Sequence, residues 1–254
     1  MEYMNDKVLT DPRKLMTSEL RVKGIDIEKI SVPQRVYLLA DDIFDKMIEF
    51  DCGEYKFPIG GRLWVLKDNP GVGFVKSMMC SPAIATQAED LIACGVKELI
   101  HIGYAGGLQK EMNPGDIVIT DGAYNDTAVA RLYGFDRKII ESTATLSMEL
   151  QEMFIKQQIP ILRGKTWTTD AGYHETVGQV HYYRNKNALC VEMEGVGLFT
   201  IAKYRECRSS AVYIVSDVFD EEDWCLGWEE NIISNAVNTV LETLIVNSVI
   251  YKVV

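Results

Sequence analysis

Apolar residues recur every three or four positions in two stretches of the chain, residues 33–50 and 229–249. This spacing aligns apolar side chains along one face of a helix, so the pattern predicts an amphipathic helix in each stretch. Pro33 suits the first turn of the earlier helix, because the first helical amide groups have no intrahelical partner. The apolar stripe of the later helix consists of Ile232, Ile233, Ala236, Val237, Val240, Leu241 and Leu244.

Short apolar runs alternate with further helical patterns through most of the chain. The runs at 62–67 and 72–77 flank the turn sequence Asp-Asn-Pro-Gly and predict a hairpin. We expect further strands at 98–103, 116–120, 161–169 and 211–217, and further helices at 81–95, capped by Ser81, and at 145–158, 176–186 and 194–204. This alternation is typical of the α/β class, so we expect a single domain with three α/β/α layers around a central mixed β-sheet.

The N-terminal residues 1–30 are charged and weakly patterned, so we interpret them as an arm or cap on a main domain of residues 31–254. They contain no apolar signal core, and no window of the chain approaches the roughly 18 apolar residues that a membrane span requires. The six cysteines include no C-x-x-C pair, which favours a reducing compartment. We therefore expect a cytoplasmic protein that does not associate with membranes.

Charge excludes one class of partner. The chain has 254 residues and a formal net charge of −11, which repels a phosphate backbone, so we expect no binding to nucleic acid. The three histidines do not lie at the spacing of metal ligands, so we also expect no metal site.

The segment 189-LCVEMEGVGLF-199 contains two carboxylates, Glu192 and Glu194, in an otherwise apolar run. Burying even a neutral polar group without a hydrogen bond costs roughly 2–7 kcal/mol, so these carboxylates require partners. One glutamate at a helix N-terminus is explained by capping, whereas two around a methionine indicate a binding site.

Two other segments place polar or glycine residues where a predicted strand ends. The strand at 98–103 contains His101 and leads into a turn with Gly106 and Gly107, which allow close approach of a ligand to the backbone. The strand at 211–217 ends in Ser216 and Asp217. Each is also consistent with an ordinary turn, but in α/β sheets ligands bind at the carboxyl ends of the strands.

The motifs HIGYAGGL (101–108), NPGDIVI (113–119), TTDAGYHET (168–176), VEMEGVGLF (191–199) and IVSD (214–217) occur in an order and spacing that resemble the nucleoside phosphorylase family. This family includes bacterial purine nucleoside phosphorylase and uridine phosphorylase. The segment SVPQRVYLLADDIF (31–44) is similar to the family's phosphate loop and the helix after it. The resemblance covers about residues 30–247 and implies a nucleoside phosphorylase-like catalytic domain that cleaves an N-glycosidic bond.

The resemblance implies specific roles at the nucleoside site. Met193 and Glu194 match the pair that holds the ribose hydroxyls, and Glu192 matches a second glutamate of the same motif. Asp217 matches the aspartate with which purine-cleaving members give a proton to the base, so it favours a purine nucleoside. Further contacts to the nucleoside are expected from Gly106, Thr169, Tyr173 and His174.

The phosphate site departs from the family pattern. Arg35 matches the arginine of the phosphate loop, whereas His101 and Tyr104 stand where the family has an arginine and a serine or threonine. Histidine is mostly neutral at pH 7 and does not bind phosphate as arginine does. The resemblance implies phosphate as co-substrate, no other cofactor, and a homodimer or a trimer of dimers.

Three functions remain open at this point. Phosphorolysis of a nucleoside to free base and ribose 1-phosphate is favoured by the family and by Arg35. A nucleosidase that uses water, with Glu192 as one candidate to activate it, is favoured by the altered phosphate residues. A non-catalytic nucleoside-binding or storage protein is the third, and it ranks last because Glu194 and Asp217 are both present.

Overall fold

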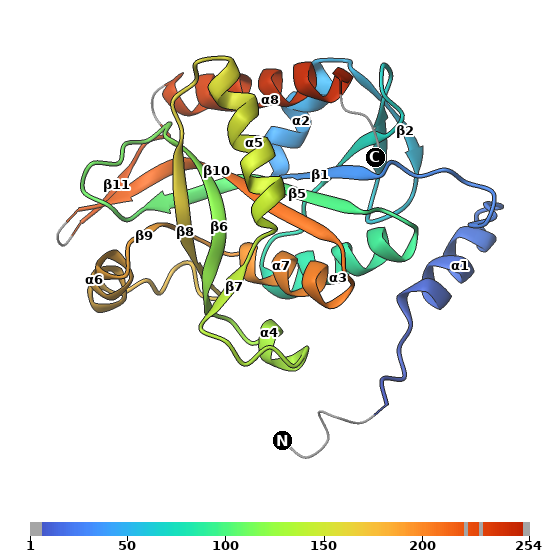
Figure 1. Ribbon diagram of the computed structural model, residues 1–254, viewed down its shortest axis with the longest axis horizontal. Coiled ribbons are helices and arrows are strands. Elements are labelled where there is room, and N and C mark those ends of the chain that lie inside the picture. The colour runs from blue at the N-terminus through green and yellow to red at the C-terminus, as the bar shows by residue number, and fades with distance from the viewer. Residues whose placement is uncertain (1–6, 221–222, 229–230, 251–254) are drawn as a thin grey trace.

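The computed structural model describes residues 7–220, 223–228 and 231–250. Within these ranges the strands form one mixed sheet with helices on both faces, so the predicted α/β/α arrangement is confirmed (Figure 1). The strands are β1 (Arg35–Leu39), β2 (Gly53–Phe57), β3 (Leu63–Leu66), β4 (Val72–Lys76), β5 (Glu98–Gly107), β6 (Ile117–Asp126), β7 (Ile139–Glu141), β8 (Leu162–Thr169), β9 (Ala188–Glu192), β10 (Arg208–Phe219) and β11 (Trp224–Leu226).

The strand order is β11-β10-β6-β8-β9-β5-β1-β4-β3-β2, with β7 paired to β6. β10 pairs with β5 as well as with β6, so β5, β10, β6, β8 and β9 close into a ring from which the other strands extend. The strand β1 lies between β4 and β5 and runs parallel to both. The ring was not expected from the sequence, because pairing partners depend on segments far apart in the chain.

Two layers of helices cover the sheet (Figure 1). The helices α2, α5 and α8 pack on one face over an apolar cluster that includes Phe44, Phe154 and Leu241. On the opposite face α3 and α7 cover a second cluster, and α1 packs against α3 through Met16 and Leu20. The helices are α1 (Pro12–Val22), α2 (Asp41–Glu49), α3 (Ser81–Ala93), α4 (Val129–Leu132), α5 (Ala144–Lys156), α6 (Val177–Asn185), α7 (Gly195–Tyr204) and α8 (Asn231–Ile250). Residues 1–6 of the expected N-terminal arm lie outside the described ranges.

The single helix predicted for residues 33–50 is wrong in its first half. Residues Arg35–Leu39 form the central strand β1, which is buried along its whole length, and the helix α2 begins only at Asp41. A strand buried on both faces reads as a continuous apolar run, which helical periodicity does not distinguish. Ala40 alone therefore connects β1 to α2.

The cap expected at Ser81 is also wrong. Cys80 occupies the N-cap position of α3 with φ 73°, and Ser81 is the first helical residue. The Ser81 hydroxyl instead donates to the carbonyl of Met193, 3.0 Å away. The residue that was expected to begin α3 therefore joins this helix to the turn before α7.

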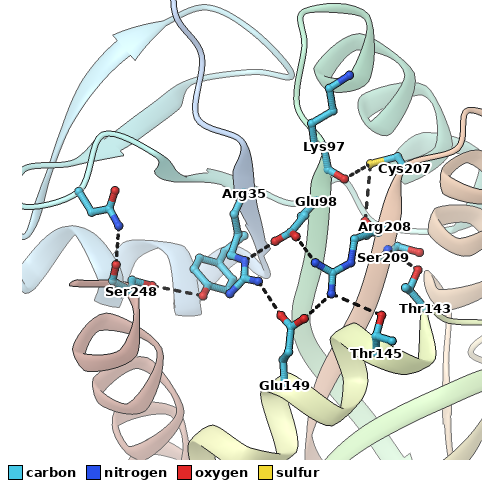
Figure 2. A network of polar contacts seen from close by, with 12 residues as sticks. Arg35, Lys97, Glu98, Thr143, Thr145, Glu149, Cys207, Arg208, Ser209 and Ser248 are labelled. Carbon is cyan, nitrogen blue, oxygen red and sulfur yellow. Dashed lines mark hydrogen bonds and ion pairs between the residues drawn. The ribbon is translucent and has the colours of Figure 1, made fainter. Parts of the chain in front are cut away.

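Arg35 belongs to a network of charged residues at the start of β1 (Figure 2). Its side chain is 1% exposed and donates from Nε to Glu98 Oε2 at 2.6 Å and from Nη2 to Glu149 Oε2 at 3.1 Å. Arg208 pairs with the same two glutamates. Two arginines and two glutamates thus neutralise one another between β1, β5, β10 and α5.

We predict that Glu98→Ala lowers the free energy of unfolding by about 3–5 kcal/mol, because it leaves Arg35 without its buried counter-charge. Urea denaturation measures this change. The matched control is Glu28→Ala, which removes the exposed ion pair with Arg13 and should cost less than about 1 kcal/mol. Equal losses in the two variants would contradict a stabilising role for the network.

Candidate functional site

The ends of four neighbouring strands bring several of the predicted site residues together. Asp217 on β10 is in register with Gly106 on β5, and Gly106 is in register with Val191 on β9. Thr168 on β8 lies beside Glu192 on β9. The ends of β5, β8, β9 and β10 therefore meet, although they come from four distant parts of the chain.

Glu192 is buried and surrounded by hydrogen-bond donors. Its carboxylate accepts from the hydroxyls of Thr166 at 3.0 Å, Thr168 at 2.5 Å and Tyr213 at 3.0 Å. It also accepts from the backbone amides of Glu194 at 2.7 Å and Gly195 at 2.6 Å. Burial raises the pKa of Glu192, and these bonds oppose the rise. Because its lone pairs are occupied, the carboxylate suits holding the turn after β9 and does not suit activating water.

Glu194 lies in the turn between β9 and α7 and is 8% exposed. Its Oε1 accepts from the backbone amide of Cys80 at 2.7 Å, and its Oε2 accepts from the amide of Met193 at 3.3 Å. Burial first, and then the charge of Glu192, raise the pKa of Glu194 to about 7. The Glu194 carboxyl is thus held at the strand ends, where it takes up a proton more readily than a free glutamate, and it accepts from the backbone amide just before the first turn of α3.

Asp217 has a fixed donor on each carboxylate oxygen. The Ser216 hydroxyl donates to Oδ1 and the Trp224 indole donates to Oδ2, both at 2.6 Å. Gly106 leaves room for this group, because a Cβ at that position would lie 2.9 Å from Asp217 Oδ2. Trp224 is expected from the sequence to serve in packing, and its strand β11 folds back so that the indole reaches Asp217.

The sequence did not single out Glu175, a further carboxyl group whose pKa is affected by the charge of Asp217. It is half-buried in the loop between β8 and α6. Burial and the charge of Asp217 raise the pKa of Glu175 to about 7. A perturbed pKa beside another carboxylate is the signal that could have found it, and this signal needs three-dimensional proximity.

The other predicted contacts are divided between the interior and the solvent. Thr169 is buried at the end of β8 and its hydroxyl accepts from the amide of Ala171 at 3.2 Å. Met193 is half-buried in the turn beside Glu194. Tyr173 is 99% exposed and His174 is also exposed, so neither side chain packs with the carboxylates.

The structure does not bring the three predicted phosphate residues together. Arg35 pairs in register with Glu98, eight residues before Gly106, which corresponds to about 26 Å along an extended strand. Arg35 therefore lies apart from the carboxylates at the strand ends and pairs with Glu98 and Glu149, and its phosphate contact stays a prediction. His101 is buried, its Nδ1 has no hydrogen-bond partner among the described residues, and burial lowers its pKa to about 3, so the ring is neutral.

Tyr104 donates its hydroxyl to Asp42 Oδ2 at 2.6 Å, and burial raises its pKa. This places the acidic residues Asp41 and Asp42, rather than an arginine, in the position after β1. Asp41 forms an ion pair with Lys76 at the end of β4. The corner of the sheet beside β1 and β5 is therefore acidic at the point where the resemblance implied an anion site.

A cavity of about 630 Å³ lies elsewhere, between α8 and the starts of β6 and β8. Its apolar lining includes Ile117, Ile161 and Ile232, and none of the predicted site residues lines it. In the described part of the chain, no cluster of three or more His, Cys, Asp or Glu residues could hold a metal ion. No described helix is both long enough and apolar enough to span a bilayer.

Residues 49–245 match the sequence pattern of the phosphorylase superfamily. The chain belongs to this superfamily. A guanosine phosphorylase from Halorubrum lacusprofundi is 25% identical to it over 201 residues, which are 77% of this chain and 81% of that protein. A uridine phosphorylase structure from Vibrio fischeri ES114 superposes with a TM-score of 0.71 at 17% identity and covers 89% of this chain and 95% of its own.

Some superfamily relatives match over a shorter length. A DeoD-type purine nucleoside phosphorylase from Brevibacillus brevis is 26% identical over 139 residues, which are 54% of this chain and 59% of that protein. The chain thus spans less than two thirds of this relative. Membership of the superfamily gives the fold, and the activity, substrate and acceptor must be argued from the site.

We predict that the free energy of unfolding of Glu194→Gln falls less between pH 5 and pH 8 than that of the wild type. The folded-state pKa of Glu194, about 7, is above its ordinary value of 4.5, so the folded wild type binds more protons than the unfolded chain between these values. Wild-type stability therefore falls as pH rises through this window, by up to about 3 kcal/mol from this group. Glutamine has no charge to bury.

Urea denaturation of the wild type and Glu194→Gln at pH 5 and pH 8 measures this difference. The contributions of other groups with raised pKa values cancel in the comparison, because both proteins contain those groups. Glu152→Gln, on the exposed side of α5, is the control and should follow the wild type. The same pH dependence in Glu194→Gln and wild type would contradict the buried charge.

Proposed function

We propose that this protein cleaves the N-glycosidic bond of a purine-type nucleoside with water as the acceptor. The observation that carries the proposal has two parts. Glu194 and Asp217 lie at the same end of neighbouring strands, whereas Arg35 and Tyr104, which were expected to bind phosphate, bond to acidic side chains. The superfamily supports the bond that is cleaved, and the acidic corner beside β1 supports water. Residues 31–254 would form the catalytic domain, and 1–30 an accessory arm.

In this proposal Glu194 grips the ribose. A carboxylate can accept hydrogen bonds from both the 2′- and 3′-hydroxyls, and its charge stabilises the oxocarbenium-like sugar that forms as the bond breaks. Glu192 supports this role indirectly, because it fixes the amides of Glu194 and Gly195. Met193, beside the same turn, would contact the sugar. Gly106 would let the substrate approach the end of β5.

Asp217 would act at the base. A purine leaves more readily after it accepts a proton, so an acid group near the base lowers the barrier. Gly106 has no side chain, and the space this leaves is taken by the carboxyl group of Asp217 near the end of β10. Thr169, buried at the end of β8, would form the wall of the site on that side. Tyr173 and His174, which are exposed in the single chain, would contact the nucleoside only after the loop carrying them moves inward.

Phosphorolysis is the second candidate, and it is favoured by the superfamily relatives that are named phosphorylases. It requires a cation or amide donors for phosphate. Lys76, at the end of β4, is the basic residue beside the acidic corner, and it is paired with Asp41. A cytoplasmic homo-oligomer fits either candidate, and neither requires a cofactor beyond the co-substrate.

We predict that adenosine, inosine or guanosine releases free base at equal rates with and without phosphate. The measurement is base release from these nucleosides, uridine and methylthioadenosine, each with 0 or excess phosphate, with sugar products separated as ribose or ribose 1-phosphate. Release that requires phosphate would support phosphorolysis instead. No release from any nucleoside would favour a non-catalytic binding protein.

We predict that Glu194→Gln lowers turnover about 100- to 1,000-fold, the usual cost of removing one charge-stabilising group from an active site. Asp217→Asn should lower turnover of purine nucleosides about 100-fold or more, because it removes an acid. Steady-state kinetics on the best nucleoside of the panel measures both. Wild-type turnover in either variant would remove that residue from the mechanism.

A further inference from the structure

The turn that carries Glu194 is held from outside by the first residues of α3. Cys80, the N-cap residue, donates its backbone amide to Glu194 Oε1 at 2.7 Å. Ser81, the first helical residue, is fully buried and donates its hydroxyl to the carbonyl of Met193 at 3.0 Å. Two consecutive residues at the start of α3 thus bond to two consecutive residues of the turn, which lie 112 and 114 positions later in the chain.

The same contact continues into α7 through Gly197. A Cβ at position 197 would lie 2.3 Å from the carbonyl oxygen of Ser81 and 2.7 Å from its Cα, so the two helices meet backbone to backbone. Only glycine permits an approach this close. The start of α3 is therefore packed against α7 at the same place where it bonds to the turn.

The backbone of Cys80 is strained in the conformation that directs its amide to Glu194. Its φ is 73° and its ψ is 152°, a combination that is favourable only for glycine. A residue stays in such a conformation only where the surrounding structure holds it, and residues of this kind are concentrated at sites of binding and catalysis. Here the strained amide fixes the direction of one carboxylate oxygen.

These contacts leave half of the acceptor capacity of Glu194 open. A carboxylate has about four lone-pair positions, and Glu194 uses one on each oxygen, for the amides of Cys80 and Met193. Glu192, by contrast, accepts five hydrogen bonds and has no position left. One open position on each oxygen of Glu194 suits two adjacent hydroxyl groups, provided that the carboxylate keeps its orientation.

We propose that Cys80 and Ser81 are positioning residues that make the site selective for sugars with two adjacent hydroxyl groups. The inference rests on the proposed function, in which Glu194 grips the ribose. The amide of Cys80 fixes the direction of the carboxylate, and the hydroxyl of Ser81 fixes the turn from which it projects. When the carboxylate turns, a ribose loses the alignment of two hydrogen bonds, whereas a 2′-deoxyribose has one such bond to lose.

The test measures kcat/KM for the best purine ribonucleoside of the panel and for its 2′-deoxy counterpart. Phosphate is present throughout, so that the result does not depend on the acceptor. Ser81→Ala removes one buried hydroxyl group. We expect it to lower kcat/KM about 10-fold on the ribonucleoside and at most about 3-fold on the 2′-deoxynucleoside, because a small displacement of a binding group costs more where more bonds depend on it.

A second variant acts on the same contact from α7. Gly197→Ala places a methyl group against the backbone of Ser81 and should change the ratio of the two kcat/KM values in the same direction. If Gly197→Ala does not fold, Ser81→Ala alone decides. Thr86→Ala is the matched control, since Thr86 lies on the exposed side of α3 and donates its hydroxyl to the carbonyl of Pro82. It should leave the ratio as it is in the wild type.

Equal losses on the two nucleosides in Ser81→Ala, or no loss, would overturn the inference, because a general loss of stability does not distinguish the sugars. A wild type that cleaves neither nucleoside would overturn the proposed function, and titration calorimetry with the same two nucleosides then tests the positioning role. Binding of the ribonucleoside that Ser81→Ala weakens selectively would support that role. Equal weakening, or no binding to the wild type, would overturn it.

Discussion

The site depends on one buried carboxylate, Glu192, and on the donors that surround it. Threonine hydroxyls from β8, a tyrosine hydroxyl from β10 and two amides at the start of α7 converge on it. Its burial is tolerated because these bonds replace water, and in return it fixes three elements around one turn. The position of Glu194 follows from this arrangement, because its own backbone amide is one of the donors.

Charge is distributed differently at the two ends of the sheet. At the start of β1 and β5 two arginines and two glutamates form a closed, neutral network that contributes to stability (Figure 2). At the opposite end Glu175, Glu194 and Asp217 are only partly compensated, and two of them have raised pKa values. Partly compensated acids reduce stability, and such groups are concentrated where proteins perform chemistry.

The sequence was sufficient for the fold class, for most helices and strands, and for the two carboxylates at the ends of β9 and β10. These features depend on local periodicity or on short motifs. Sequence-based prediction failed where the position or role of a residue depends on partners that are distant in the chain. Arg35 matched a motif by residue type, but residues Arg35–Leu39 form a buried strand where helical periodicity predicted a helix, and the arginine lies at the start of that strand, away from the carboxylates. Trp224 belongs to none of the motifs, and only folding brings its indole to Asp217.

The acidic corner formed by Asp41 and Asp42 has a consequence for selection among metabolites. Nucleotides differ from nucleosides by 5′-phosphates that carry negative charge, and a chain with a net charge of −11 repels them before contact. The carboxylates of Asp41 and Asp42, just after β1, add short-range repulsion of the 5′-phosphates. Negative charge beside the site would therefore disfavour nucleotides relative to uncharged nucleosides, so that nucleotides could be abundant in solution without occupying it.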